Sequence, residues 1–189
     1  MQKTEEIEVD INLNADLGES FGAWRMGDDR ALLAVIGSAN VACGFHAGDP
    51  LVMTETVRLA GEAGVSLGAH PAFPDLQGFG RREMQLSPRE LSTVVTYQVG
   101  ALMGIAQSQG QRVTHVKPHG AMSNMACQDA AMAATIAAAV KAIDAQLILL
   151  APALSELAAA GRAAGLRVAD EVFADRAYTP KGELVSRRE

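Results

Sequence analysis

The segment Val41-Ala42-Cys43-Gly44-Phe45-His46-Ala47-Gly48-Asp49-Pro50 decides the fold, because an apolar run gives way to a polar turn and then to a helix start. Residues 41–43 predict a buried strand. Asp49 followed by Pro50 predicts a helix N-terminus, since the carboxylate caps free N–H groups and proline at the first position sacrifices none. We expect this helix to end near Gly64, which permits a left-handed stop. The segment is one β/α unit.

The same order recurs along the chain. Strands are expected at 7–13, 41–43, 65–69, 113–117, 147–151 and 166–169, with 172–173 as an extension of the last, and helices at 28–36, 50–63, 88–109, 129–143 and 154–164. Ser87-Pro88-Arg89-Glu90 is a capping box for the third helix. Six units with short connections predict an α/β fold, a parallel sheet covered by helices, in one domain over residues 1–189. Residues 178–189 are interpreted as a hairpin or arm.

Composition narrows the class of protein. The 189 residues are 49% hydrophobic and carry a net charge of −6, which argues against nucleic acid or an anionic membrane as a partner. The acidic, polar N-terminus is unlike a secretory signal, and the Ala-rich stretch 130–140 is too short to span a bilayer. Cys43 and Cys127 form neither a metal spacing nor a disulfide framework, so we expect a cytoplasmic location. An exposed sheet edge would favour a homodimer or another partner contact.

Polar side chains cluster where the predicted strands end. Because the C-termini of parallel strands meet at one face, we expect these side chains to line one pocket. They are Asp16, Glu19, His46, His70, Arg81, Arg82, His115, Lys117, His119 and Asn124. No phosphate-binding GxxxxGK[ST] or GxGxxG motif is present, so a nucleotide would be held in another way.

Asp16 and Glu19 are interpreted as a general base with an orienting group, or as two metal ligands. The alternative is that one of them only caps the next helix. A lysine at the end of a buried strand needs a partner, and Asp16 is the natural partner of Lys117. His119 lies just beyond that strand, where it can transfer a proton, and Asn124 can add a hydrogen bond. His115 is interpreted as structural.

The loops supply further candidates. His46 lies between two glycines, where packing alone explains it poorly, and His70 opens the long loop 70–86. Arg81 and Arg82 can grip a carboxylate or phosphate, or can be an ordinary pair of surface arginines. Asp170-Glu171 and Asp175-Arg176 follow the last strand and either join the same face or form internal ion pairs.

Several long motifs resemble those of one family. They are Asn12-Leu13-Asn14-Ala15-Asp16-Leu17-Gly18-Glu19-Ser20, Ser38 to Pro50, Gly68-Ala69-His70-Pro71, Gly78-Phe79-Gly80-Arg81-Arg82, His115-Val116-Lys117-Pro118-His119-Gly120-Ala121 and Glu171 to Tyr178. In this fixed order they are similar to the LamB/YcsF family. The resemblance implies a deformed parallel β/α barrel of the glycoside hydrolase/deacetylase type. Family members continue for one or two further units, so we expect the barrel of this chain to be incomplete at its C-terminal end.

The resemblance also implies an activity, the ATP-dependent hydrolysis of the cyclic amide 5-oxoproline to glutamate, with ADP and phosphate as the other products. The implied partners are subunits B and C of 5-oxoprolinase, and the implied cofactor is ATP with Mg²⁺ as its counter-ion, with no tightly bound metal. Asp16, Glu19, His46, His70, Lys117 and His119 match the polar strand-end positions of the family.

Roles follow from the chemistry of these groups. We predict that Asp16 or a neighbouring histidine activates water, that His70 and His119 transfer protons, and that Lys117 stabilises negative charge. Glu19, His46, Arg81, Arg82 and Asn124 are predicted to bind substrate. Two alternatives stay open. One is a metal-dependent hydrolase or deacetylase with Asp16, His46, His70 and His119 as ligands, and the other is a non-catalytic, truncated subunit.

Overall fold

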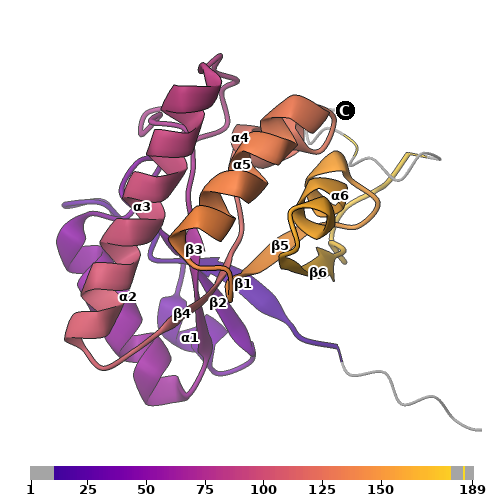
Figure 1. Cartoon of the computed structure of the whole chain (residues 1–189). Coiled ribbons are helices and arrows are strands. Elements are labelled where there is room, and N and C mark those ends of the chain that lie inside the picture. Colours follow the sequence, from indigo (N-terminus) through magenta and orange to yellow (C-terminus); the bar gives the residue numbers. More distant parts are fainter. Residues whose placement is uncertain (1–10, 180–184, 186–189) are drawn as a thin grey trace, which may run out of the picture.

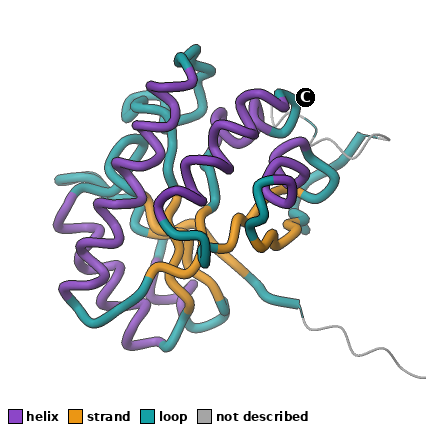
Figure 2. Tube along the Cα trace, viewed as in Figure 1, coloured by secondary structure: helices purple, strands orange, loops and turns teal. Residues whose placement is uncertain are grey.

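Among the described residues, six parallel strands form the centre of the molecule, and helices cover their outer side (Figure 1). The computed structural model describes residues 11–179 and residue 185. The strands are β1 (Asn14–Leu17), β2 (Ser38–Ala42), β3 (Ser66–His70), β4 (Val113–Val116), β5 (Ile148–Pro152) and β6 (Arg167–Glu171). They lie side by side in chain order and curl into a half-barrel (Figure 2). The predicted α/β class is confirmed.

The helices follow one another around the sheet. They are α1 (Asp29–Leu33), α2 (Pro50–Ala63), α3 (Pro88–Ser108), α4 (Gly120–Ala126), α5 (Ala130–Ile143) and α6 (Glu156–Ala163). The predicted N-caps are confirmed: Asp49 accepts from the N–H groups of Leu51 and Val52, and Ser87 and Glu90 form the capping box. Apolar side chains of the sheet and the helices bury one another, and this core includes Val41, Val57, Leu67, Val99, Leu102, Val116, Ile136 and Leu149.

The first strand differs from its prediction. Residues 11–13 are not in a strand, residues 7–10 lie outside the described part, and β1 begins at Asn14. The alternation of side chains pointed to Ile11 and Leu13, but these are 81% and 59% exposed. Polar Asn14 and Asp16 occupy the strand instead, because partners on β2 and beyond β4 satisfy their side chains.

Smaller corrections concern helix and strand ends. The predicted helix 28–36 is shorter, since α1 ends at Leu33 and the chain turns to bring the Gly37 and Ser38 N–H groups to the Leu13 carbonyl. The sequence did not predict α4, whose N-cap, His119, makes no side-chain capping bond. The other strands and helices are found within a few residues of their predicted bounds. Most of the predicted arm 178–189 lies outside the described residues.

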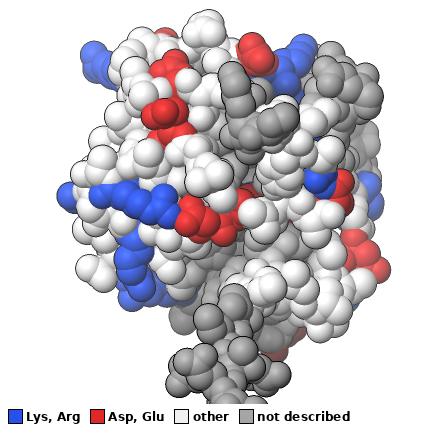
Figure 3. Space-filling view, turned by 90° about the vertical axis from the view of Figure 1, so that its right-hand side faces the viewer, with Lys and Arg blue, Asp and Glu red and all other residues white. Residues whose placement is uncertain are grey.

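The distribution of charged side chains and the length of the apolar helices bear on the partners expected from the composition. On the face of α6 and β6, acidic and basic side chains of the described residues are interspersed (Figure 3), and Arg162 pairs with Asp170 there. Within residues 11–179, no single helix is long and apolar enough to cross a membrane, and only the bent pair α4 and α5 passes that test, by length and composition alone.

Gly68 provides a first test of the packing inside the half-barrel. It pairs with His115 across β3 and β4, and a Cβ at this position would overlap the His115 ring. We expect Gly68→Ala to lower the free energy of unfolding by about 1–3 kcal/mol, the usual range for overpacking. Urea unfolding followed by circular dichroism measures this change.

Gly100→Ala is the matched control. A Cβ at Gly100, in the middle of α3, would meet no atom within 4 Å, so helix propensity should stabilise this variant by up to about 1 kcal/mol. Equal stability of Gly68→Ala and the wild type would show that the packing around His115 is looser than described.

Candidate functional site

The polar side chains meet at the C-terminal end of the sheet. Asp16 lies in β1, His70 and Glu171 are the last residues of β3 and β6, and the others lie in the loops within about four residues of a strand end. The group brought together is Asp16, Glu19, His46, His70, Lys117, His119 and Glu171. All strands are parallel, so the sheet alone accounts for this convergence.

Lys117 is the centre of an ion group. Its side chain is 9% exposed, and its Nζ lies 3.2 Å from Asp16 Oδ1 and 2.7 Å from Glu171 Oε1. It also donates to Asn14 Oδ1 at 3.2 Å. The three donors of the ammonium therefore have three acceptors, which a buried charge needs to be tolerated. The pairing of Lys117 with Asp16 is as predicted, and one of the two residues of Asp170-Glu171 joins the same group.

Asn40 connects the ion group of Lys117 to β2 by hydrogen bonds. Its side chain is fully buried in β2, and its Nδ2 donates to Asn14 Oδ1 at 2.7 Å and to Asp16 Oδ1 at 3.0 Å. Its Oδ1 lies 3.0 Å from His115 Nε2, whose N–H donates to it. Asn40 thus fixes the Asp16 carboxylate, while His115 lies one contact away from the ion group.

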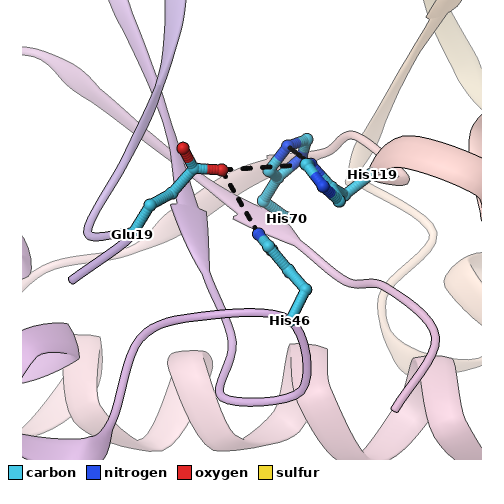
Figure 4. Close-up of side chains that lie close together, drawn as sticks. All are labelled: Glu19, His46, His70 and His119. Atoms are coloured by element: carbon cyan, nitrogen blue, oxygen red, sulfur yellow. Dashed lines mark hydrogen bonds and ion pairs between the residues drawn. The ribbon is translucent and has the colours of Figure 1, made fainter. Parts of the chain in front are cut away.

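Three histidine rings converge on the Glu19 carboxylate (Figure 4). Glu19 Oε1 lies 3.3 Å from His46 Nε2 and 3.9 Å from His119 Nδ1. His119 Nδ1 is 2.9 Å from His70 Nε2. The His46 and His119 rings stack with centroids 3.9 Å apart. One potential ligand atom from each of the four residues lies within 4.8 Å of the others.

Main-chain carbonyls orient two of these rings. His70 Nδ1 lies 2.6 Å from the Lys117 carbonyl, and His119 Nε2 lies 2.9 Å from the Phe79 carbonyl. A carbonyl only accepts, so each of these nitrogens carries a proton and donates it. His70 Nε2 also lies 3.3 Å from Asp16 Oδ2, which connects the histidines to the ion group.

Burial shapes the charges of the site. It lowers the pKa of His46 to about 3, and burial, followed by the repulsion that His70 and His46 would exert when protonated, lowers the pKa of His119 to about 3. It raises the pKa of the Glu19 carboxyl. Burial alone would also raise the pKa of Asp16, but attraction to His70, Lys117 and His119 holds it well below its usual range. Asp16 is therefore ionised at neutral pH.

Glycines let the loops approach one another. Gly18 follows β1 with φ of 68°, and Asp29 accepts its N–H at 3.0 Å, which positions the turn that carries Glu19. Gly80 has φ of 64°, and a Cβ there would lie 2.9 Å from both His119 Cδ2 and His46 Cβ. Any other residue at Gly18 or Gly80 would strain the backbone, because both positions have positive φ.

The remaining predicted residues lie outside this group. The Arg82 guanidinium is hydrogen-bonded to Asp75, with Nε 2.9 Å from Oδ1, and so stabilises the loop after β3. Arg81 is exposed, and its guanidinium lies over the Phe79 ring, 5.1 Å from the centroid, close enough for its charge to act on Glu19. Asn124 is exposed on α4, and no hydrogen bond among the described residues joins it to the group.

Sequence reasoning gave no role to Asn40, to Asn14 or to the Phe79 carbonyl. A polar residue inside the apolar run of β2 was the available signal for Asn40, since buried amides need partners. No side-chain pattern could identify a carbonyl. Phe79 has φ of 55°, and its backbone conformation follows from the tertiary path of the loop.

Comparison with known proteins agrees with these motifs. The sequence model of the LamB/YcsF family matches residues 11–189. A protein of Azoarcus sp., named as the A subunit of 5-oxoprolinase, is 70% identical over 94% of this chain, and the match covers 69% of that protein. A protein of the same name from Methylococcus capsulatus is 63% identical over 94% of this chain, and the match covers 68% of that protein.

A solved structure has the same fold. The crystal structure of a lactam utilization protein from Thermus thermophilus superimposes with a TM-score of 0.92 at 49% sequence identity. The match covers 95% of this chain and 73% of that one. The chain thus corresponds to about 70% of the length of these relatives.

Proposed function

The chain belongs to the LamB/YcsF family, and from this premise we propose that it is the A subunit of a 5-oxoprolinase. In this proposal the assembled enzyme, with subunits B and C, opens 5-oxo-L-proline to L-glutamate while ATP is converted to ADP and phosphate. A single domain, a cytoplasmic location and a possible homodimer are parts of the same proposal. Both cysteines are free thiols, which agrees with a reducing compartment.

One observation carries the proposal: the buried Lys117 ammonium is held between two carboxylates next to a histidine pair. Lysine supplies a fixed positive charge where negative charge develops on oxygen, and Asp16 offers a carboxylate that is 33% exposed. The relatives, named for 5-oxoprolinase and for lactam utilization, support a lactam as the substrate.

A lactam is difficult to hydrolyse, because resonance stabilises it and its nitrogen is a poor leaving group. Transfer of the γ-phosphoryl group of ATP to the amide oxygen would give an activated imidate. Water then adds to the former carbonyl carbon of the lactam. The ring C–N bond breaks, and the nitrogen leaves as an amine after taking a proton. Hydrolysis of the remaining acyl phosphate yields glutamate and phosphate.

The residues of the site have separate roles in this scheme. Asp16 accepts a proton from the attacking water, and His70 Nε2, 3.3 Å from Asp16 Oδ2, can receive it in turn. His70 and His119 hold the proton between their facing nitrogens and return it to the leaving nitrogen. Lys117 stabilises the negative charge on the oxygen or the phosphoryl group. Glu19 and His46 form the wall of the substrate site.

Arg81 is the candidate anchor for the substrate carboxylate, since the Arg82 guanidinium is already bound to Asp75. We expect Arg81→Gln to raise the KM for 5-oxoproline about 10- to 100-fold with a small change in kcat, because one charge-assisted hydrogen-bonded contact is lost. Steady-state kinetics of the assembled enzyme measure this change.

Arg82→Gln is its matched control and should change the KM about threefold or less. The anchor assignment would be wrong if the two variants had the same KM, or if only Arg82→Gln raised it.

Reconstitution tests the function itself. The chain is combined with subunits B and C, and glutamate formation from 5-oxoproline is measured with and without ATP. We expect ATP-dependent turnover that is abolished in the double variant Asp16→Ala/Lys117→Ala. Arg112→Ala is the control, since Arg112 precedes β4 at the other end of the sheet and pairs only with Asp144 among the described residues. Normal turnover by the double variant would favour a purely structural role for the chain.

A further inference from the structure

Two nitrogen lone pairs face each other in the histidine group. His70 donates its Nδ1 proton to the Lys117 carbonyl, and His119 donates its Nε2 proton to the Phe79 carbonyl. A neutral imidazole carries one proton, so His70 Nε2 and His119 Nδ1 are both bare acceptors. These two nitrogens are 2.9 Å apart. Two acceptors at this distance need a proton or a cation between them.

A proton on His70 Nε2 would also be shared with Asp16 Oδ2, 3.3 Å away, but the further donor atoms around the point are those of a cation site. Glu19 Oε1 lies 3.9 Å from His119 Nδ1 and 3.3 Å from His46 Nε2, so a carboxylate and a third imidazole border the same point. The donor–donor edge of a tetrahedron with metal–ligand bonds of about 2.0–2.1 Å is roughly 3.3–3.4 Å. The distances between donor atoms in the group, 2.9, 3.3 and 3.9 Å, lie on both sides of this value.

We propose that Glu19, His46, His70 and His119 bind a divalent transition-metal ion, for which Zn²⁺ has the best-matching donor preference. Three imidazoles and one carboxylate suit zinc and its first-row neighbours, whereas Mg²⁺ and Ca²⁺ prefer oxygen ligands alone. The Lys117 and Phe79 carbonyls are the outer hydrogen-bond acceptors that metal-bound histidines usually have. Three of the four residues are buried, so water competes little for the ion.

His46 is the ligand with the least support from its surroundings. Its Nε2 faces Glu19, while its Nδ1 is buried without a hydrogen-bond partner among the described residues. Ligation through Nε2 requires the ring proton to be on Nδ1. His46 therefore completes the group, and Glu19, His70 and His119 are expected to contribute most of the affinity.

This inference goes beyond the proposed function, because all the donors belong to this chain and the ion would bind whatever the substrate is. It changes the roles of four residues, because Glu19 and His46 bind the ion instead of forming the wall of the substrate site, and His70 and His119 bind it instead of holding a proton. With an ion bound, the two facing nitrogens no longer carry a proton. Asp16 lies outside the ligand group and then transfers the proton itself. With four protein ligands in a tetrahedron the ion would have no open position, so it would act through its positive charge next to the ion group of Lys117.

Direct metal analysis tests the inference. The full chain is stripped with a chelator, loaded with zinc sulfate, dialysed and analysed by inductively coupled plasma mass spectrometry, and apo protein is titrated with Zn²⁺ by calorimetry. We expect about one zinc ion per chain. Glu19→Gln and His119→Gln should weaken binding by more than about 100-fold, above the cost of losing an outer-shell partner.

His115→Gln is the matched control, since His115 is a buried histidine of the same sheet outside the ligand group. It should keep one ion per chain. Circular dichroism checks that each variant is folded, and Glu19→Gln is the variant of choice because Glu19 is the least buried of the four. Zinc should also raise the Tm of the wild type but not that of Glu19→Gln.

Two results would overturn the inference: less than about 0.1 zinc ion per loaded wild-type chain, or wild-type affinity in the folded Glu19→Gln variant. Because these readouts measure binding alone, their failure leaves the ring-opening proposal untouched. Loss of lactam turnover in the reconstituted enzyme would likewise leave a measured metal site in place.

Discussion

Replacing Lys117 by methionine is expected to lower the kcat/KM of lactam opening by about 10²- to 10³-fold and the free energy of unfolding by about 3–5 kcal/mol. The first effect follows from the loss of a fixed positive charge where negative charge develops. The second arises because the Asp16 and Glu171 carboxylates, 3.2 and 2.7 Å from Nζ, lose their shared cation. Kinetics of the assembled enzyme and urea unfolding of the chain measure the two effects.

A double variant separates these effects. Lys117→Met/Glu171→Gln removes the carboxylate whose side chain is only 4% exposed, so it should recover a large part of the lost stability. It should not recover activity, since no cation is restored. If the double variant were no more stable than Lys117→Met, or if Lys117→Met cost less than about 1 kcal/mol, the ion group would not have the energetic role assigned to it.

Asp16→Asn is expected to lower kcat by about 10²- to 10⁴-fold with little change in KM, the range for losing a positioned proton acceptor. The amide keeps the size of the carboxylate and can still bond to Asn40 and Lys117. Only the charge and the basicity are lost. The measurement is glutamate formation under saturating 5-oxoproline and ATP.

Asp129→Asn is the control for this charge change. Asp129 caps α5 through one carboxylate oxygen, which accepts from the N–H groups of Ala131 and Met132, and asparagine is an equally good N-cap, so both stability and turnover should stay close to wild type. A kcat for Asp16→Asn within about threefold of wild type would remove Asp16 from the catalytic scheme and leave it as a partner of Lys117.

The order of strands and helices could be predicted because each β/α unit carries its own signals. The Asp49-Pro50 and Ser87-Pro88 starts fix α2 and α3 from local chemistry alone. The start of β1 could not be predicted in this way. Its polar residues are stable inside the sheet only because Lys117 and Asn40, distant in sequence, satisfy them.

The contacts of the site also fall into those that could be predicted from the sequence and those that could not. Parallel strands bring Asp16, His70 and Lys117 to one end, so their proximity, including the pairing of Asp16 with Lys117, was predictable from topology. The engagement of Arg82 by Asp75 depends on the path of the loop after β3. The position of the Phe79 carbonyl depends on the same loop. Neither is encoded in a periodic pattern.

The two carbonyls that orient His70 and His119 belong to the peptide backbone, and this has an evolutionary consequence. No substitution at Phe79 or Lys117 removes a peptide oxygen. Sequence drift at these positions can alter the surroundings of the rings, but it cannot by itself exchange which nitrogen bears the proton. The orientation of the two imidazoles is therefore more durable than the identity of the side chains around them, and it changes only if the loop takes another path.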